Sequence, residues 1–297
     1  MTAQIVLPKP LTSLQRCQDY IPNFPDAHTP ILKRILDSTS AFVCRYCNRD
    51  FWPQDYTEYL NGTGFNNLLL SQYPVLAVSR VSTALLQIVQ IRNTDFTHSR
   101  AIGQLTSTEL LLNAWRGATQ TSQLTFTLTN YNTLGDLATA INNAGDSWTA
   151  LAMGQYAAWS PLELPTPQGG FDALWGGACY LKAYTRDLYD FQLNGNTGEL
   201  VSWQGFFQRY LGYRIQYTAG YQDANGTPAI PELIQQAVVE IAASVYLSRG
   251  VNIGLKSESE SIYSYTLSDS DLSSLNIPTM YALDLYKNRR VPRYSIV

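Results

Sequence analysis

Two cysteines, Cys44 and Cys47, have the spacing of one half of a zinc site. A closed structural zinc site needs four ligands. The chain offers no second pair at ligand spacing, since its other cysteines and histidines are single: Cys17, Cys179, His28 and His98. A thiol without a metal behaves as a small hydrophobic group. We therefore expect Cys44 and Cys47 to be buried in a helix, and the sequence predicts neither a metal site nor a bound cofactor.

The residue types needed for catalysis are also sparse. The sequence lacks a Gly-x-Ser-x-Gly nucleophile motif, and a nucleophile would have to use His28 or His98 as its base. Asp187 and Asp190 are three positions apart in a presumed strand, so their side chains would point to opposite faces. Residues 62–64 lack the third glycine and the helix of a dinucleotide loop, and they favour a hairpin turn instead. The sequence predicts that the protein is not an enzyme.

Aromatic side chains make up 12% of the residues, and four tryptophans fall in one stretch of the chain: Trp115, Trp148, Trp159 and Trp175. Such rings could stack on the sugar rings of a carbohydrate. They could equally fill a small core or a protein interface. A carbohydrate-binding or adhesion protein and a structural interaction protein therefore both remain open, whereas the residue types above weigh against a hydrolase.

Charge is scarce in this chain. Charged residues make up 14% of it, well below the usual ~25%, and the net charge is −3. No overall basic field exists that would hold nucleic acid by its phosphates. No apolar run reaches the ~20 residues of a membrane helix, and the N-terminal residues lack the pattern of a signal peptide. We expect a protein without a membrane partner that is made in a cytoplasm.

Four helices are predicted outside residues 85–185. Residues 11–47 contain two of them, and the second begins with Thr29 as its N-cap and Pro30 at its first helical position. A long helix near 231–249 is the clearest, because its apolar residues recur at helical spacing. This stripe is formed by Ile234, Ala237, Val238, Ile241 and Val245. Pro278 opens a short C-terminal helix.

Strands are predicted at 56–84 and 186–220, with a hairpin turn at 194–198. Residues 85–185 form a separate unit, in which a strand at 124–129, a helix capped by Thr133 and Asp136, and a strand near 147–153 make a β-α-β unit. The Pro-rich stretch 160–170 is expected to be its exit linker.

The predicted fold class is therefore α+β. It consists of a helical bundle (two N-terminal helices, the long helix near 231–249 and the short C-terminal helix) with a small antiparallel β-sheet, plus an inserted β-rich module. Residues 1–84 and 186–297 would form the core, and residues 85–185 the module.

Five short motifs occur in a fixed order in the presumed core. They are Arg49-Asp50-Phe51 at the end of a helix, Thr57 to Gly62 (T-E-x-x-x-G), Leu70 to Val75 (L-x-x-x-P-V), Tyr217 to Tyr221 (Y-x-A-G-Y) and Ile230 to Ala237 (I-P-x-x-I-x-x-A). This order resembles the head–tail connector proteins, also called adaptor or head-completion proteins, of long-tailed double-stranded DNA bacteriophages. The resemblance covers about residues 1–84 and 186–297. The inserted module is a departure, although its TLGDLATAINNAGDSWTA segment resembles an extra module of some longer members.

The resemblance implies a structural virion protein, an adaptor whose copies form a ring of twelve beneath the portal protein. A tail-side neck or stopper protein would be a further partner, and DNA would pass through the lumen without specific binding. The location would be the neck of the virion, after assembly in the host cytoplasm. The alternative that the tryptophans keep open is a carbohydrate-binding or adhesion protein of a virion surface.

The C-terminal segment is the candidate site for portal binding. It places four cations in a short stretch of an acidic protein, followed by residues that could add as a strand to an exposed edge. These residues are Lys287, Arg289, Arg290, Arg293, Tyr294 and Ile296. The arginines would pair with carboxylates of the partner and increase the association rate. The alternative is a solvated tail without a role.

Overall fold

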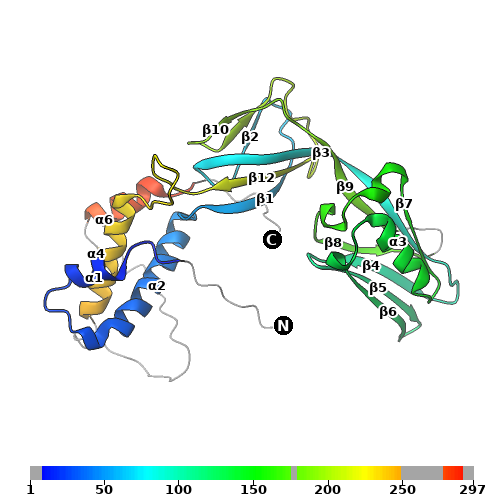
Figure 1. The fold of residues 1–297 in the computed structure, drawn as a ribbon, viewed down its shortest axis with the longest axis horizontal. Coiled ribbons are helices and arrows are strands. Elements are labelled where there is room, and N and C mark those ends of the chain that lie inside the picture. The colour runs from blue at the N-terminus through cyan, green and yellow to red at the C-terminus, as the bar shows by residue number, and fades with distance from the viewer. Residues whose placement is uncertain (1–8, 175–178, 249–276, 290–297) are drawn as a thin grey trace.

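The computed structural model describes residues 9–174, 179–248 and 277–289. The fold is α+β, as the sequence predicted. The N-terminal and C-terminal helices gather at one end of an elongated molecule, a twisted antiparallel sheet lies in the middle, and the inserted module lies at the other end (Figure 1). Buried apolar residues form three clusters, one in each of these parts.

The helices and 3-10 turns of the described chain are α1 (Leu14–Tyr20), η1 (Asp26–His28), α2 (Thr29–Cys47), η2 (Leu128–Asn130), α3 (Leu134–Asn143), η3 (Gly154–Ala158), η4 (Pro161–Glu163), α4 (Glu232–Ser248) and α6 (Ile277–Tyr286). The strands are β1 (Gln54–Leu60), β2 (Asn67–Leu69), β3 (Val75–Asn93), β4 (Arg100–Leu105), β5 (Glu109–Arg116), β6 (Thr119–Thr127), β7 (Trp148–Ala152), β8 (Gln168–Asp172), β9 (Cys179–Asp187), β10 (Gln192–Asn194), β11 (Glu199–Val201) and β12 (Tyr213–Ala219).

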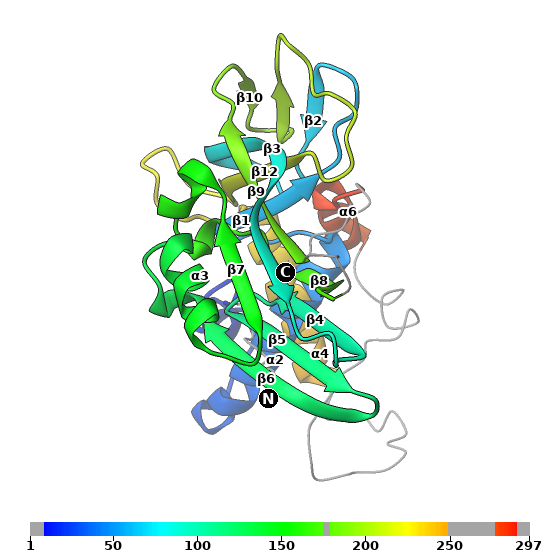
Figure 2. The ribbon, with the colours of Figure 1, turned by 90° about the vertical axis from the view of Figure 1, so that its right-hand side faces the viewer.

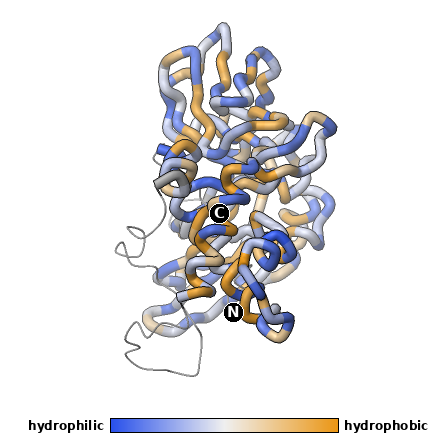
Figure 3. Tube along the Cα trace, turned by 90° about the vertical axis from the view of Figure 1, so that its left-hand side faces the viewer, coloured by the Kyte–Doolittle hydropathy of each residue, from blue (hydrophilic) through white to orange (hydrophobic). Residues whose placement is uncertain are grey.

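The helical bundle forms around α4, which packs against α1, α2 and α6. The predicted stripe of α4 faces this core: Ile234, Ala237, Val238 and Ile241 are buried and Val245 packs against the cluster. Hydrophobic and hydrophilic stretches alternate along the chain at this end of the molecule (Figure 3). The amphipathic pattern therefore identified the buried face of the helix correctly.

The predicted start of α2 was wrong in detail. Thr29 is already helical, with φ −49° and ψ −45°, and its hydroxyl accepts a hydrogen bond from the Gln18 side chain. His28 occupies the N-cap position without a side-chain cap bond, while Pro30 lies in the first turn as expected. The helix ends at Cys47, where Asn48 adopts the left-handed conformation with φ 49°.

The junction between bundle and sheet contains several residues of the motifs described above. Phe51, after α2, stacks on Tyr221, after β12, with ring centroids 5.8 Å apart. Gly220 (φ +142°) lies so close to Pro53 that a Cβ atom would come within 2.5 Å of its backbone, so only glycine fits. Glu58 accepts a hydrogen bond from Tyr217 across β1 and β12. Phe51, Gly220 and Tyr221 thus hold the bundle against the sheet, and Glu58 and Tyr217 join two strands of the sheet itself.

The central sheet has the order β1-β12-β3-β7, and β9 also pairs with β3. All its pairings are antiparallel. A second sheet, β10-β11-β2, includes the hairpin predicted at 194–198. The hairpin predicted at 62–64 is wrong, because β1 pairs with β12 and β2 pairs with β11. The loop between β1 and β2 instead connects two different sheets.

One strand, β3, runs through both the central sheet and the inserted module. It pairs with β12 over Val75–Ser82 and with β7 over Val89–Asn93. The division expected at residues 84 and 85 falls inside this strand, and the one at 185 and 186 falls inside β9. Ala84 has a left-handed φ of 60° at that point of β3. The polypeptide therefore enters and leaves the module through two paired strands.

The module combines α3 with a four-stranded sheet of order β6-β5-β4-β8 (Figure 2). The capping box of Thr133 and Asp136 at α3 is confirmed. The order strand, helix, strand is also confirmed, but β6 and β7 belong to different sheets, so they do not form a single β-α-β sheet unit. The stretch 160–170 is not a linker, because it forms η4 and the start of β8, which pairs with β4.

Candidate interaction surfaces

The sequence-predicted site begins directly after α6, where only its first residues lie in the described part of the chain. Lys287 and Arg289 are exposed, and the Lys287 ammonium lies 4.3 Å from the centre of the Tyr46 ring. Burial and the hydrogen bond to Asp284 raise the pKa of Tyr46 to about 12. The other predicted residues, Arg290, Arg293, Tyr294 and Ile296, lie outside the described residues.

Asn288 fixes the point from which the C-terminal segment leaves. Its side chain is buried, its backbone N–H donates to the carbonyl of Cys47 (2.7 Å), and its Nδ2 donates to the carbonyl of Ser71 (2.8 Å). These bonds connect the end of α2 with the loop before β3. The cations on either side of Asn288 are therefore presented from a fixed position rather than from a frayed helix end.

A second candidate surface consists of two neighbouring loops, residues 61–66 and 202–212, which we call the aromatic loops. Four of their aromatic side chains are largely exposed: Phe65 (72%), Trp203 (78%), Phe207 (74%) and Tyr210 (79%). Arg209 is the single charged residue in the two segments. Exposed aromatic rings in a surface with so little charge are typical of the centre of a protein interface.

Backbone hydrogen bonds hold the aromatic loops together. The N–H groups of Gly62 and Gly64 donate to the carbonyls of Arg209 and Phe206, and the N–H of Phe206 donates to Phe65. Phe206 is itself buried, with its ring edge-on to Tyr213 at 5.3 Å. The exposed rings are therefore mounted on an ordered frame, which lowers the conformational entropy that binding would cost.

Sequence reasoning missed this surface and favoured strands throughout 186–220. The signal was a run of aromatic residues at 203, 206, 207 and 210, interrupted by Gly205 and followed by Gly212, without the alternation of a strand. The tryptophans singled out earlier serve the module itself. Trp148 is buried and donates to Ser122, Trp159 packs edge-on against Tyr156, and Trp115 lies under Arg100. Trp175 lies outside the described residues.

The cysteine pair behaves as expected for a helix core. Cys47 is buried and Cys44 is half-buried in α2. Burial raises the pKa of Cys44 to about 11 and that of Cys47 to about 12, so both remain thiols at neutral pH. Within the described residues, no three His, Cys, Asp or Glu side chains lie in position to hold a metal ion.

The two histidines are engaged in structural contacts. The His28 ring bonds to the hydroxyl of Tyr246 (2.6 Å), which joins η1 to α4. The buried His98 ring bonds to Asn93 (3.0 Å). Neither contact involves a serine or cysteine. Asp187 also has a structural partner, since it accepts hydrogen bonds from Arg80 and Ser82.

An ion-pair network joins the module to the central sheet. Glu163, on η4, lies 2.8 Å from both Arg80 of β3 and Arg214 of β12. Arg80 also pairs with Asp187 at 2.9 Å. The side chain of Arg214 is only 5% exposed, so its charge depends on Glu163 for compensation.

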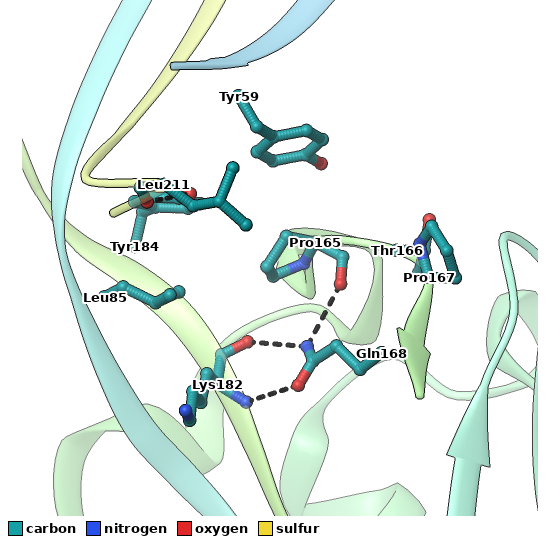
Figure 4. A pocket seen from close by; sticks show the side chains of 9 residues that line it. All are labelled: Tyr59, Leu85, Pro165, Thr166, Pro167, Gln168, Lys182, Tyr184 and Leu211. Atoms are coloured by element: carbon teal, nitrogen blue, oxygen red, sulfur yellow. Dashed lines mark hydrogen bonds between the residues drawn. The ribbon is translucent and has the colours of Figure 1, made fainter. Parts of the chain in front are cut away.

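A small pocket of about 170 Å³ lies at the same joint. The Gln168 side chain exchanges two hydrogen bonds with the backbone of Lys182 and donates to the carbonyl of Pro165 (Figure 4). Tyr59 and Tyr184 stack at 6.0 Å on its other side. Its lining is mostly apolar and contains no carboxylate, histidine or cysteine, so the pocket belongs to the joint between module and sheet.

Comparisons with known proteins give a structural likeness but no match in sequence. No family model matches the chain, and no curated protein matches it. None of the helices in the described ranges combines the length and apolar character of a membrane span. A solved structure described as the neck of an empty GTA particle, computed with C6 symmetry, is similar over 97% of this chain and 95% of that chain, with 11% sequence identity and a TM-score of 0.40.

Proposed function

We propose that this chain is a structural protein of a bacteriophage neck, an adaptor subunit that joins the portal of the head to the tail. Copies of it would form a ring beneath the portal, with a central channel for DNA. The observation that carries the proposal is the pair of aromatic loops, in which four exposed rings stand on an ordered frame with a single charge. Such a surface suits burial against another protein.

The resemblance of the sequence to head–tail connector proteins is the reason for placing the subunit in the neck in this proposal. Its motifs occupy the junction between bundle and sheet, where Phe51, Gly220 and Tyr221 pack together. Because these residues set how the two parts of the core meet, the motifs encode the shape of a subunit rather than a reaction centre. The net charge of −3 also suits a channel through which DNA moves without being held.

A ring of identical subunits needs two different patches on each copy, because the contacts are head-to-tail. The aromatic loops would supply one patch toward a neighbouring copy or the tail-side protein. The C-terminal segment would supply the contact with the portal. Its proposed portal-binding residues are Lys287, Arg289, Arg290, Arg293, Tyr294 and Ile296.

The test is assembly with the portal protein of the same virus. We expect the purified chain to co-sediment with portal rings and to add a layer visible by negative-stain electron microscopy. Replacing Trp203 and Phe207 by Ser should reduce assembly at least tenfold, which corresponds to about 1.4 kcal/mol. The control is Tyr20→Ser, which removes another exposed ring, at the end of α1. Failure of the unaltered chain to join any portal assembly would refute the proposal.

One specific observation supports the alternative that the protein binds carbohydrate. The aromatic loops adjoin a cavity of about 320 Å³ whose lining includes Arg186, Asp190, Gln204 and Phe207. Polar side chains beside an aromatic ring suit a sugar as well as a protein. Carbohydrate binding would be favoured if the chain bound a glycan array and did not assemble with the portal. Asp190→Asn and Gln204→Ala should then abolish the glycan binding, whereas Trp203→Ser should leave it intact.

A further inference from the structure

A groove of about 690 Å³ runs along β1 and is not used by the function proposed above. Its lining includes Asp50, Ser71 and Gln72, which flank β1 in the core, and Leu162, Leu164 and Thr166 of the module. Among the described strands, β1 pairs with β12 alone. The groove therefore exposes the free backbone edge of a sheet, the kind of edge to which an extended segment adds as a further strand.

The groove carries an excess of negative charge. Asp50, Asp55 and Glu58 line it, and they accept hydrogen bonds from uncharged side chains and, in the case of Glu58, also from a backbone N–H. None of the three forms an ion pair within the described ranges. Arg214 is the single cation of the lining, and its ion-pair partner is Glu163. The groove thus suits an extended segment with positive charge.

The C-terminal segment has the matching charge and starts beside this groove. Asn288 donates a hydrogen bond to the carbonyl of Ser71, a residue of the groove wall. Residues 290–297 read RVPRYSIV and contain two arginines and no acidic residue. Fully extended, eight residues span roughly 26 Å, and the seven residues of β1 span roughly 23 Å. The segment is therefore long enough to follow the whole strand.

We infer that, in the free subunit, residues 290–297 lie in the groove of their own chain and add to the edge of β1. Arg290 and Arg293 face Asp50 and Asp55, and the β-branched and aromatic residues near Ile296 cover Leu162 and Leu164 of the lining. Pro292 has no N–H, so it takes a position that faces away from β1. The segment then has two destinations, this groove before assembly and a partner protein afterwards. The inference concerns the isolated chain and stands independently of the portal.

Hydrogen exchange followed by mass spectrometry tests this inference on the full chain. Peptides covering β1 should exchange roughly tenfold more slowly in the full chain than in a chain ending at Arg289, because the segment shields the free edge. The difference should shrink at 500 mM salt, since the pairs lie near the surface. Replacing Arg290 and Arg293 by Ser, or Asp50 and Asp55 by Asn, should each reproduce the truncation.

Two controls separate this contact from a general charge effect. Lys33→Ser with Arg34→Ser removes two exposed cations of α2, and Asp37→Asn removes a carboxylate of the same helix. Both should leave the exchange of β1 unchanged. Equal exchange in full and truncated chains would overturn the inference, provided circular dichroism shows that both are folded. Protection that disappears on hundredfold dilution would also overturn it, because the segment would then come from a second copy.

Discussion

The guanidinium of Arg214 lies 2.8 Å from the carboxylate of Glu163, and this ion pair joins β12 of the central sheet to η4 of the module. Arg80 of β3 shares the same carboxylate. Glu163, Arg80 and Arg214 thus form an ion-pair network, which we call the clasp, beside the strands β3 and β9 that lead into the module. The relative position of module and sheet is held by specific contacts as well as by the continuity of β3.

The first prediction concerns this clasp. Glu163→Gln should lower the free energy of unfolding at pH 7 by about 2–4 kcal/mol, because it leaves the buried guanidinium of Arg214 without its carboxylate. The control is Glu109→Gln, which removes a carboxylate that forms no ion pair within the described ranges. Urea denaturation measures both variants. Equal stability of the two variants would show that the clasp contributes little.

The pH dependence of stability follows from the same network. Burial raises the pKa of Glu163, but the hydrogen bonds and charges of Arg214 and Arg80 outweigh it and lower the pKa below its ordinary value. A lowered pKa gives stabilisation that is fully present above the ordinary carboxyl pKa of about 4 and is lost as the pH falls through the lowered value. Denaturation curves from pH 7 to pH 3 should therefore fall less steeply for Glu163→Gln than for the unaltered chain.

The third prediction tests whether the module can be removed. Leu86 of β3 and Ala183 of β9 are register partners, so replacing residues 87–182 by Asn-Gly should close the strands as a hairpin. The shortened chain loses Glu163, the ion-pair partner of Arg214. Adding Arg214→Leu should therefore stabilise the shortened chain, while the same substitution destabilises the full chain. Thermal unfolding compares the four proteins, and insolubility of both shortened chains would argue for a shared core.

The fourth prediction concerns the bundle. Ile241→Ala should cost about 2–5 kcal/mol of stability through lost burial and the cavity left behind, because Ile241 is 1% exposed in the cluster around α4. Leu247→Ala on the same helix should change stability by less than about 0.5 kcal/mol, since Leu247 is 57% exposed. A similar urea midpoint for the two variants would contradict this assignment of the buried face.

The fifth prediction concerns the frame of the aromatic loops. A Cβ atom on Gly62 would lie 1.7 Å from the carbonyl oxygen of Phe207, so Gly62→Ala must displace the loop. We expect a cost of about 1–3 kcal/mol and faster proteolysis within residues 202–212. The control is Gly169→Ala, where a Cβ atom would meet nothing within 4 Å. Unchanged proteolysis of Gly62→Ala would show that the loops do not depend on this close approach.

Much of the fold followed from periodicity in the sequence. The stripe of α4, the capping box at α3 and the hairpin of β10 and β11 each rest on contacts between residues near in sequence. The pairing of β1 with β12 could not be predicted in this way, because it joins segments on either side of the module. The same limit explains the false hairpin at 62–64, where Gly62 serves the approach of Phe207 rather than a tight turn.

The candidate surfaces were less predictable than the fold. The aromatic loops depend on Phe206 being buried while Phe207 is exposed, and that distinction comes from the bonds between two loops distant in sequence. The groove along β1 likewise arises only where residues distant in sequence, such as Ser71 and Leu164, come to line one strand. The exposure of side chains at such places depends on tertiary contacts, which local sequence patterns do not predict.

The position of β12 in the chain has a consequence for the order of folding. Glu58 and Tyr217 share a hydrogen bond although they are 159 positions apart, so the central sheet closes only after the module has been synthesised. The module gathers its own apolar cluster from contiguous residues, and these local contacts form faster than distant ones. Once folded, it brings β3 and β9 together and shortens the loop that β12 must close, which lowers the entropic cost. A folded module thus reduces the chain separation across which β12 has to find its partner strands.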